Sequence, residues 1–431
     1  MTEILLNVSR YLMMFIMLFY VYLSFRGKKY ILQNILTGIN FLICSITMLY
    51  HTHNSGWLAL SIFEIIYSVI TIVLYRIIYP KGSKLLLNNM IMLLSIGFVF
   101  VYRLVPNSAW KQFMVIAMGT AISFGIPAVF KYRRTWVELR YILALAGIVL
   151  LGLALIVGKT SYGANLSVDF GFFSFQPSEL VKITYVIFLS GTLSIAQNIK
   201  DHIVAGGLAG IHLIILVLSN DLGAALIFAV VYIIMLYIAT GKLRFLFAGT
   251  FIGSIASGLA IIFVPHVKTR MIAWLRPWDY IDDKGYQITQ SMFAIGTGGF
   301  FGLGLFEGLP NRIPVVAKDF IFAAISEELG LIYAIGIILI CFATFINIMR
   351  VATRVNNPFY KLMAVGFGIM YIFQCFLNIG GVIKFIPSTG VTLPFVSYGG
   401  SSVLSSIIMF SIIQAVFILD SNSSKGAKNE K

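Results

Sequence analysis

The feature of this sequence that most constrains its fold is a succession of long apolar runs. Each run is near the ~20 residues that an α-helix needs to cross a bilayer. Because the backbone finds no water inside a bilayer, such runs predict transmembrane helices, whereas a membrane barrel has short alternating segments. We place thirteen runs at about 5–25, 31–50, 57–75, 86–105, 111–130, 138–158, 178–197, 202–219, 222–240, 243–264, 320–349, 359–385 and 401–420.

The composition excludes a soluble chain. Apolar residues make up 59% of the 431 residues, charged residues make up 11%, and the mean hydropathy is +0.94. A soluble domain has about 25% charged residues, and a disordered chain has few apolar ones. We therefore predict an all-α polytopic membrane protein. The net charge of +15 lies mostly in short loops, where anionic membrane lipid explains it and no nucleic-acid partner is needed.

The basic residues also predict how the spans are oriented. With the N-terminus outside, the inner segments hold 19 of the 31 lysines and arginines and the outer segments hold 10. The other two, Arg10 and Lys182, lie in spans. Cytoplasmic loops carry the excess of basic residues. We therefore predict an extracytoplasmic N-terminus and a cytoplasmic C-terminus, with a short polar tail over 421–431 on the inner side.

Two outer segments are unusual for loops. Residues 265–318 form a connection of over 50 residues that is rich in apolar and aromatic side chains, so we expect an ordered and partly membrane-embedded structure. Residues 386–400 carry no charge but contain two prolines, three glycines and several hydroxyls. Non-helical backbone at membrane depth must be buried in protein or line a water-filled cavity.

Ionisable residues in or beside the spans need a partner or a function. Glu179 and Lys182 have the i, i+3 spacing of an ion pair on one helix face, which is one structural explanation for them. Asp221 fits a turn and helix cap, and the pair Glu327-Glu328 fits the start of a helix, where the macrodipole favours acids. Lys384 ends a span, where its side chain could extend to the interface.

The long outer loop gathers acids and bases. Three acids, Asp279, Asp282 and Asp283, lie within five residues. One explanation is a calcium site made of clustered carboxylates, and another is a solvated charged turn. The flanking basic residues are Arg270, Arg276 and Lys284.

The same polar residues belong to six motifs that together resemble one family. The sequence resembles the SEDS family (shape, elongation, division and sporulation), of the RodA/FtsW/SpoVE type. The resemblance runs from about residue 86 to 420, and the order of the motifs around one long outer loop makes it specific. The motifs are Phe175-Gln-Pro-Ser-Glu-Leu-Val-Lys182, Asp221-Leu-Gly-Ala-Ala-Leu226, Lys284-Gly-Tyr-Gln287 with Gln290-Ser291, Lys318-Asp-Phe-Ile-Phe-Ala323, Glu327-Glu-Leu-Gly330 and Pro387-Ser-Thr-Gly-Val-Thr-Leu-Pro-Phe-Val-Ser-Tyr-Gly-Gly-Ser-Ser402.

The resemblance implies an organisation and an activity. It implies a ten-helix core over 81–420, so the three spans within 1–80 are expected to be an N-terminal addition. Proteins of this family are peptidoglycan glycosyltransferases of the bacterial cytoplasmic (inner) membrane. They polymerise lipid II, the undecaprenyl-pyrophosphate-linked disaccharide peptide, at the outer leaflet during elongation, division or sporulation. They work with a class B penicillin-binding protein that crosslinks the strands.

The resemblance also implies an essential acid in the long outer loop, before the Gly-Tyr-Gln. Relatives typically read Pro-Trp-(Glu/X)-Asp-Pro there, whereas this sequence reads Pro277-Trp-Asp-Tyr-Ile-Asp-Asp-Lys-Gly285. Without gaps, Tyr280 takes the place of the family aspartate. Asp279 lies one residue before it and Asp282 two residues after it. Either acid is a candidate for the catalytic base, and we favour Asp279.

The chemistry that we hypothesise for these residues is an inverting displacement. An aspartate takes the proton from the acceptor sugar 4-hydroxyl, and that oxygen attacks the anomeric carbon of the donor. Partial desolvation at the membrane edge would raise the pKa of such a base. The pyrophosphate leaving group needs positive charge, which Arg270, Lys182, Lys384 or a divalent cation such as Mg²⁺ or Mn²⁺ could supply. Glu179, Gln287, Ser397 and Ser401, from the motifs, are further substrate-binding candidates, and no residue is predicted as a metal ligand.

Two other functions remain open from the sequence. Thirteen spans with embedded charges also suit a lipid-precursor flippase or secondary transporter, although matching pairs of Gly/Pro-interrupted spans are not evident. The displaced aspartate also fits a non-catalytic scaffold of the cell-wall machinery. Synthesis of glycan strands by the purified protein would exclude the first, and activity gained by Tyr280→Asp would favour the second.

Overall fold

The computed structural model describes residues 2–132, 136–157, 159–161, 164–169 and 174–429. Arg133, Arg134 and Lys431, which entered the charge count, lie outside the described residues. The main helices are α1 (Thr2–Arg26), α2 (Tyr30–Thr52), α3 (Ser55–Ile78), α4 (Lys84–Leu104), α5 (Pro106–Tyr132), α6 (Arg140–Val157), α7 (Pro177–Leu193), α8 (Ile199–Leu218), α9 (Leu222–Thr240), α10 (Leu243–Phe263), α13 (Ile321–Arg354), α14 (Pro358–Val382) and α15 (Gly400–Asn429).

Each of the thirteen predicted spans corresponds to one of these helices, which confirms the helical membrane fold. Within the described residues, eleven helices are long and apolar enough to cross a membrane. The apolar part of α6, Arg140–Ile156, is shorter, and α7 has 17 residues. The last helix continues to Asn429, where the sequence predicted a polar tail from 421. Helix propagation adds one hydrogen bond for each residue, so a helix can extend past its apolar part.

The connecting segments contain further elements. The long outer loop contains α11 (Pro265–Leu275), the 3₁₀ helix η1 (Trp278–Tyr280), α12 (Tyr286–Gly298) and the 3₁₀ helix η2 (Pro310–Arg312), so the prediction that it is ordered is confirmed. Three short strands precede α7 and form an antiparallel sheet in the order β1-β2-β3. No strand was predicted here, because strands of this length give no clear periodicity. They are β1 (Lys159–Ser161), β2 (Ala164–Asp169) and β3 (Ser174–Phe175).

The chain divides into two compact units. The chain passes from one to the other within α5, α11, α13 and α14 and just before α15. Unit 1 comprises Met1–Thr120, Ile272–Asn347 and Cys375–Gly399, and unit 2 comprises Ala121–Met271, Ile348–Gln374 and Gly400–Lys431.

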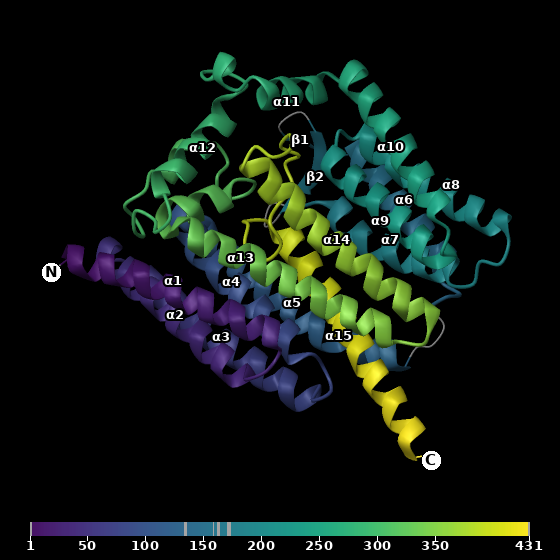
Figure 1. Cartoon of the computed structure of the whole chain (residues 1–431), viewed down its shortest axis with the longest axis horizontal. Coiled ribbons are helices and arrows are strands. Elements are labelled where there is room, and N and C mark those ends of the chain that lie inside the picture. Colours follow the sequence, from purple (N-terminus) through teal and green to yellow (C-terminus); the bar gives the residue numbers. More distant parts are fainter. Residues whose placement is uncertain (1, 133–135, 158, 162–163, 170–173, 430–431) are drawn as a thin grey trace. The chain divides into compact units, whose positions relative to one another are not determined.

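In unit 1, the three N-terminal helices cover α4. Helix α1 packs on α2, and α2 packs on α3 and α4 (Figure 1). Hydrogen bonds specify this packing, since the hydrophobic effect contributes little between helices in lipid. The Tyr20 hydroxyl donates to Asn89 Oδ1 at 3.1 Å, and Asn89 Nδ2 donates to Thr344 at 2.9 Å. Asn40 donates to the Tyr333 hydroxyl at 3.0 Å, so α1 and α2 are both tied to the rest of the unit.

Helix α13 is interrupted at Gly330, where φ is 83° and ψ is 167°. Only glycine adopts such a backbone conformation without a large cost. The outer loop binds beside this break. The amides of Leu303 and Gly304 donate to the carbonyls of Glu327 and Glu328, at 3.0 and 2.9 Å. The break thus lets a helix terminus and a loop satisfy each other's backbone groups.

We expect Gly330→Ala to lower the melting temperature of the detergent-solubilised protein. A Cβ at this position would clash with the backbone of Gly302 and Phe301, and the backbone conformation alone would cost about 1–3 kcal/mol. Gly296→Ala is the matched control, because Gly296 lies in α12 with open space around it. Equal melting temperatures for the two variants would contradict a required break.

In unit 2, α7 lies among the other helices. It packs on α6, α8, α9 and α15, and α9 also packs on α10 (Figure 1). Most of α7 is buried. Polar residues on this helix therefore have to find partners inside the unit.

Candidate functional site

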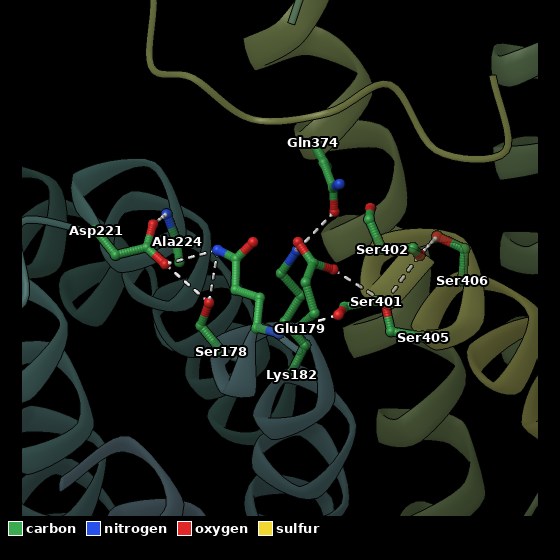
Figure 2. Close-up of polar contacts among 11 residues, drawn as sticks. Ser178, Glu179, Lys182, Asp221, Ala224, Gln374, Ser401, Ser402, Ser405 and Ser406 are labelled. Carbon is green, nitrogen blue, oxygen red and sulfur yellow. Dashed lines mark hydrogen bonds and ion pairs between the residues drawn. The ribbon is translucent and has the colours of Figure 1, made fainter. Parts of the chain in front are cut away.

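A cluster of buried polar side chains lies at the N-terminal end of α7 in unit 2. Lys182 Nζ donates to Glu179 Oε1 at 2.8 Å and to Gln374 Oε1 at 3.0 Å. Ser405 on α15 donates to the other Glu179 oxygen at 2.9 Å (Figure 2). Glu179 is 7% exposed and Lys182 is 4% exposed. The predicted ion pair is therefore present, and it joins α7, α14 and α15.

The sequence explains why these charges start a helix. Pro177 stands at the first helical position, where its missing N–H costs nothing. Glu179 follows in the first turn, where the macrodipole favours an acid, and Lys182 lies three residues later on the same face. Local helix geometry therefore brings the two charges together on one face of α7.

Asp221 caps α9 and also contacts α7, as the sequence predicted for a turn and cap residue. Its Oδ1 accepts from the Ala224 amide at 3.1 Å, and its Oδ2 accepts from the Ser178 hydroxyl at 2.8 Å (Figure 2). Burial raises the pKa of the Asp221 carboxyl, and the hydrogen bonds from Ser178 and Ala224 oppose that rise. The hydroxyl of Ser401 accepts from the Gln176 amide at 3.0 Å, just before α7.

The charge of the ion pair is balanced. The positive charge of Lys182 is matched by Glu179, and Gln374 and Ser405 complete the hydrogen bonding. A buried pair of this kind contributes specificity of packing more than net stability. An incoming anion would have to compete with Glu179 for the ammonium group.

We expect the two charges to be interdependent in stability. Glu179→Gln and Lys182→Met should each lower the melting temperature, because each leaves a buried charge unpaired at a cost of about 3–5 kcal/mol. The double variant should be less destabilised than the sum of the two single variants. Thermal unfolding of all four proteins in detergent measures this coupling, and simple additivity would show that the pair is not coupled.

The three predicted acids lie on a tight turn in unit 1, which we call the acid-bearing turn (residues 277–285). The Gly285 amide donates to the Tyr280 carbonyl at 2.8 Å. A Cβ at Gly285 would collide with the carbonyl oxygen of Pro277. The close return of the chain therefore requires glycine, which explains the Lys-Gly-Tyr-Gln motif.

All three acids are exposed, so the chain itself does not supply the expected partial desolvation. Asp279 lies in η1, whose residues occur three to a turn. Asp282 and Asp283 follow η1 in a hydrogen-bonded turn, in which the Asp283 amide donates to the Tyr280 carbonyl at 3.1 Å.

Helix α12 is anchored beside this turn by side chains of the motifs. Gln287 Nε2 donates to the Pro314 carbonyl at 2.9 Å, and the Ser291 hydroxyl donates to the Val382 carbonyl at 2.9 Å. Trp274 Nε1 donates to the carbonyl of Lys384 at 3.1 Å. Gln287 and Lys384, both predicted as substrate-binding residues, thus take part in fixing the outer loop.

In the second outer loop, residues 393–397 are buried in protein, whereas the rest of residues 386–400 are partly or fully exposed. Ser397 is 1% exposed, and its hydroxyl accepts from the Leu393 amide at 2.9 Å. The Gln112 side chain donates to the Ser397 carbonyl and accepts from the Gly399 amide, both at 3.1 Å. A Cβ at Gly97 would lie 2.6 Å from the Val396 carbonyl oxygen, so glycine lets this loop approach α4.

The predicted site residues fall into both units. Those of unit 2 are joined in the polar cluster, except for Arg270, which lies on α11. On α11, burial and the positive charge of Arg270 both lower the pKa of the His266 imidazole. The residues of unit 1 are Asp279, Asp282, Gln287, Lys384 and Ser397, and those of unit 2 are Glu179, Lys182, Arg270 and Ser401.

Sequence reasoning missed several partners. Gln374 and Ser405 form hydrogen bonds with the ion pair. Gln112 forms hydrogen bonds with backbone groups of the second outer loop. A signal existed for α15, where hydroxyl residues recur at helical spacing within an apolar run. Gln374 and Gln112 are polar residues in apolar runs, which indicates that each has a partner without identifying it.

Metal ligands are not gathered in the described part of the chain. No group of three or more His, Cys, Asp or Glu side chains there could hold a metal ion. The calcium site considered for the acid-bearing turn therefore lacks a set of three clustered ligands among these residues.

Comparisons with known proteins match most of the chain. The family model FTSW_RODA_SPOVE, described as cell cycle protein, matches residues 81–421. The peptidoglycan glycosyltransferase RodA of Mycobacterium tuberculosis (strain H37Rv) is 32% identical over 372 residues, covering 78% of each chain. The probable peptidoglycan glycosyltransferase FtsW of Nitrosomonas europaea is 31% identical, covering 78% of this chain and 92% of its own.

Solved structures share the fold. A chain of a peptidoglycan synthase complex has a TM-score of 0.68 at 23% identity, covering 78% of this chain and 97% of its own. RodA of Thermus thermophilus has a TM-score of 0.59 at 23% identity, covering 77% and 95%. The family match begins after α1, α2 and α3.

Proposed function

Because the chain belongs to the FtsW/RodA/SpoVE family of cell cycle proteins, we propose that it is a peptidoglycan glycosyltransferase that polymerises lipid II at the outer face of the bacterial cytoplasmic membrane. The names of its relatives support the reaction class. The acid-bearing turn is the observation that carries the mechanism, since it exposes Asp279 and Asp282 close together in the chain, directly before the Gly-Tyr-Gln of the family motif. The role lies in elongation, division or sporulation.

The reaction joins two lipid-linked saccharides. The acceptor sugar 4-hydroxyl loses its proton as its oxygen attacks the anomeric carbon of the donor, and the bond to undecaprenyl pyrophosphate breaks. An α-linked donor then gives a β-linked chain by inversion. Because pyrophosphate leaves readily once its charge is balanced, one carboxylate is enough, unlike the two that glycoside hydrolases use.

Asp279 acts as the base in this proposal, with Asp282 as the second candidate. Both are exposed, so a sugar hydroxyl can reach either one directly. The bound saccharide itself would displace water from the carboxylate, which strengthens the interaction with the reacting proton. In this proposal the turn keeps the carboxylate in place, and the bound substrate excludes water from it.

Arg270 and Lys384 are the cations that we assign to the departing pyrophosphate. Lys182 is a weaker candidate, because Glu179 already balances its charge. We assign the Glu179–Lys182 pair, Ser401, Gln287 and Ser397 to positioning of the segments that bind the substrate, since each takes part in hydrogen bonds between segments.

Replacing the base should abolish polymerisation. We expect Asp279→Ala to lower the rate of glycan-strand synthesis from purified lipid II by at least about 100-fold, as removal of a general base does. Asp283→Asn is the matched control, since it removes an exposed charge from the same turn while leaving both candidate bases in place. The readout is the length and amount of glycan strands made by the purified protein.

Other outcomes of this experiment identify the alternatives. Full activity of both Asp279→Ala and Asp282→Ala would contradict the assigned base. A gain of activity in Tyr280→Asp, starting from an inactive protein, would favour a non-catalytic scaffold. Glycan strands made in detergent, without a membrane partition, would contradict a flippase or transporter.

The proposed reaction requires the acid-bearing turn outside the cell, which agrees with the predicted N-out, C-in orientation. In spheroplasts, Glu307→Cys should react with a membrane-impermeant maleimide without permeabilisation. Asn356→Cys, in the connection between α13 and α14, should react only after permeabilisation. Both positions are exposed, whereas the natural cysteines Cys44, Cys341 and Cys375 are buried. The reverse labelling pattern would contradict the orientation.

We extend the proposal to a crosslinking partner, a class B penicillin-binding protein. The support is the shared fold with a chain of a complex that coordinates polymerisation and crosslinking. A glycosyltransferase at the outer face supplies the strands that a transpeptidase needs, so a lasting complex would keep both reactions on the same strand.

A further inference from the structure

The helices α1, α2 and α3 lie outside the family match, yet α1 and α2 contact the outer loop within unit 1. The contacts converge on residues 299–306, which we call the loop segment. This segment follows α12 directly and runs beside the break in α13. Because α12 joins the loop segment to the acid-bearing turn, these contacts bear on the position of the proposed catalytic base.

Helix α1 binds the loop segment through a charged side chain. Arg10 Nη1 donates to the Gly302 carbonyl at 3.0 Å. The neighbouring Tyr11 ring packs edge-on against Phe301, with 5.5 Å between ring centroids. An arginine in a span needs a partner, and here the partner is loop backbone. Arg10 thus ties the first helix to a segment almost 300 residues later.

Helix α2 binds the same segment through an aromatic contact. The His51 ring stacks on Phe306 at 5.2 Å between centroids and 16° between planes. The Arg103 guanidinium also lies 4.3 Å from the centre of the Phe306 ring and pairs with Glu328 at 3.1 Å. Phe306 has a φ of 76°, which a residue with a side chain keeps only when its surroundings hold it there.

The core of unit 1 holds the loop segment as well. A Cβ at Gly302 would collide with the carbonyl oxygen of Glu328, so the two backbones are in close contact. At the start of the segment, a Cβ at Gly298 would collide with the Ser326 carbonyl oxygen. The segment is therefore fixed by α13 and by the N-terminal helices together.

Helix α12 links the loop segment to the acid-bearing turn. It has 13 residues, so it spans about 20 Å as a rigid rod. It begins directly after Gly285 and ends at Gly298. A shift of the loop segment would therefore be transmitted along α12 to Asp279.

We propose that α1 and α2 form a built-in clamp on the loop segment, with Arg10 and His51 as positioning residues for the glycosyl transfer. This inference rests on the proposed function for its effect on rate, but not for the contact itself. The clamp acts on the placement of the acid-bearing turn, so its loss lowers kcat and leaves KM for lipid II nearly unchanged.

The test uses the full-length chain with a spin label at Phe300→Cys, in the loop segment. Phe300 is 65% exposed and the natural cysteines are buried, so labelling is selective. Arg10→Ala should increase the mobility of the label and lower kcat about tenfold, since a misplacement of about 1 Å can cost 100-fold. Arg10→Lys retains a donor and should restore most of both properties.

Arg26→Ala is the matched control, because Arg26 lies at the other end of α1 and contacts the Tyr22 ring. It should leave label mobility and kcat unchanged. His51→Leu provides a second test, since it removes the stacked ring on Phe306 without changing Arg10. Point variants are preferred to deletion of the helices, because α4 is buried beneath them.

The outcomes separate the clamp from the proposed function. Label mobility and kcat in Arg10→Ala equal to those in Arg26→Ala would overturn the clamp. A lower melting temperature without a change in mobility or kcat would also overturn it, because Arg10 would then have only a structural role. If the unaltered protein makes no glycan strands, the proposed function fails, and label mobility alone still decides whether the clamp exists.

Discussion

The whole structure depends on satisfying backbone groups wherever the chain leaves the helix at membrane depth. A helix satisfies its own amides and carbonyls, but the segments that carry the motifs are not helical. Gln112 and Asn378 supply side-chain amides to the second outer loop, and the loop segment pairs with the break at Gly330. Glycine is required where these backbones touch. Many residues of the motifs therefore satisfy the backbone groups of non-helical segments. The residues that we propose for the reaction lie on or beside those segments.

The ionisable residues of the ion pair and of the acid-bearing turn differ in their exposure to solvent. In unit 2, the buried charges of Glu179 and Lys182 balance each other, and hydroxyl and amide groups take their remaining hydrogen bonds. The acids of the acid-bearing turn are exposed and have no such network assigned to them. A reacting carboxylate must be able to take a proton, which a fully paired carboxylate does poorly. The buried ion pair of unit 2 thus connects helices, whereas the exposed acids of the turn are the ones that we propose for the reaction.

The sequence predicted the helices better than the contacts. All thirteen spans could be predicted, because the length of an apolar run is set by the thickness of the bilayer. The break at Gly330 could not be located, since a glycine inside an apolar run has many explanations. The ion pair was predictable from i, i+3 spacing, but Gln374 and Ser405 were not, because tertiary packing brings them from α14 and α15. The structure adds what ungapped alignment could not, namely that Asp279 lies in a 3₁₀ helix and Asp282 in the turn that follows it.

The N-terminal helices are integral to unit 1 although the family match begins only at residue 81. Their hydrogen bonds reach α4 and α13 through Asn89 and Tyr333, and α2 and α3 pack on α4, which is buried along its length. An added domain joined only by apolar contact could slide in the membrane, since lipid replaces helix contacts at little cost. Buried polar pairs prevent that sliding, because separation would leave each group without a partner in hydrocarbon. A fixed register between α1 and the core is what allows Arg10, near one end of the helix, to meet a single carbonyl of the outer loop.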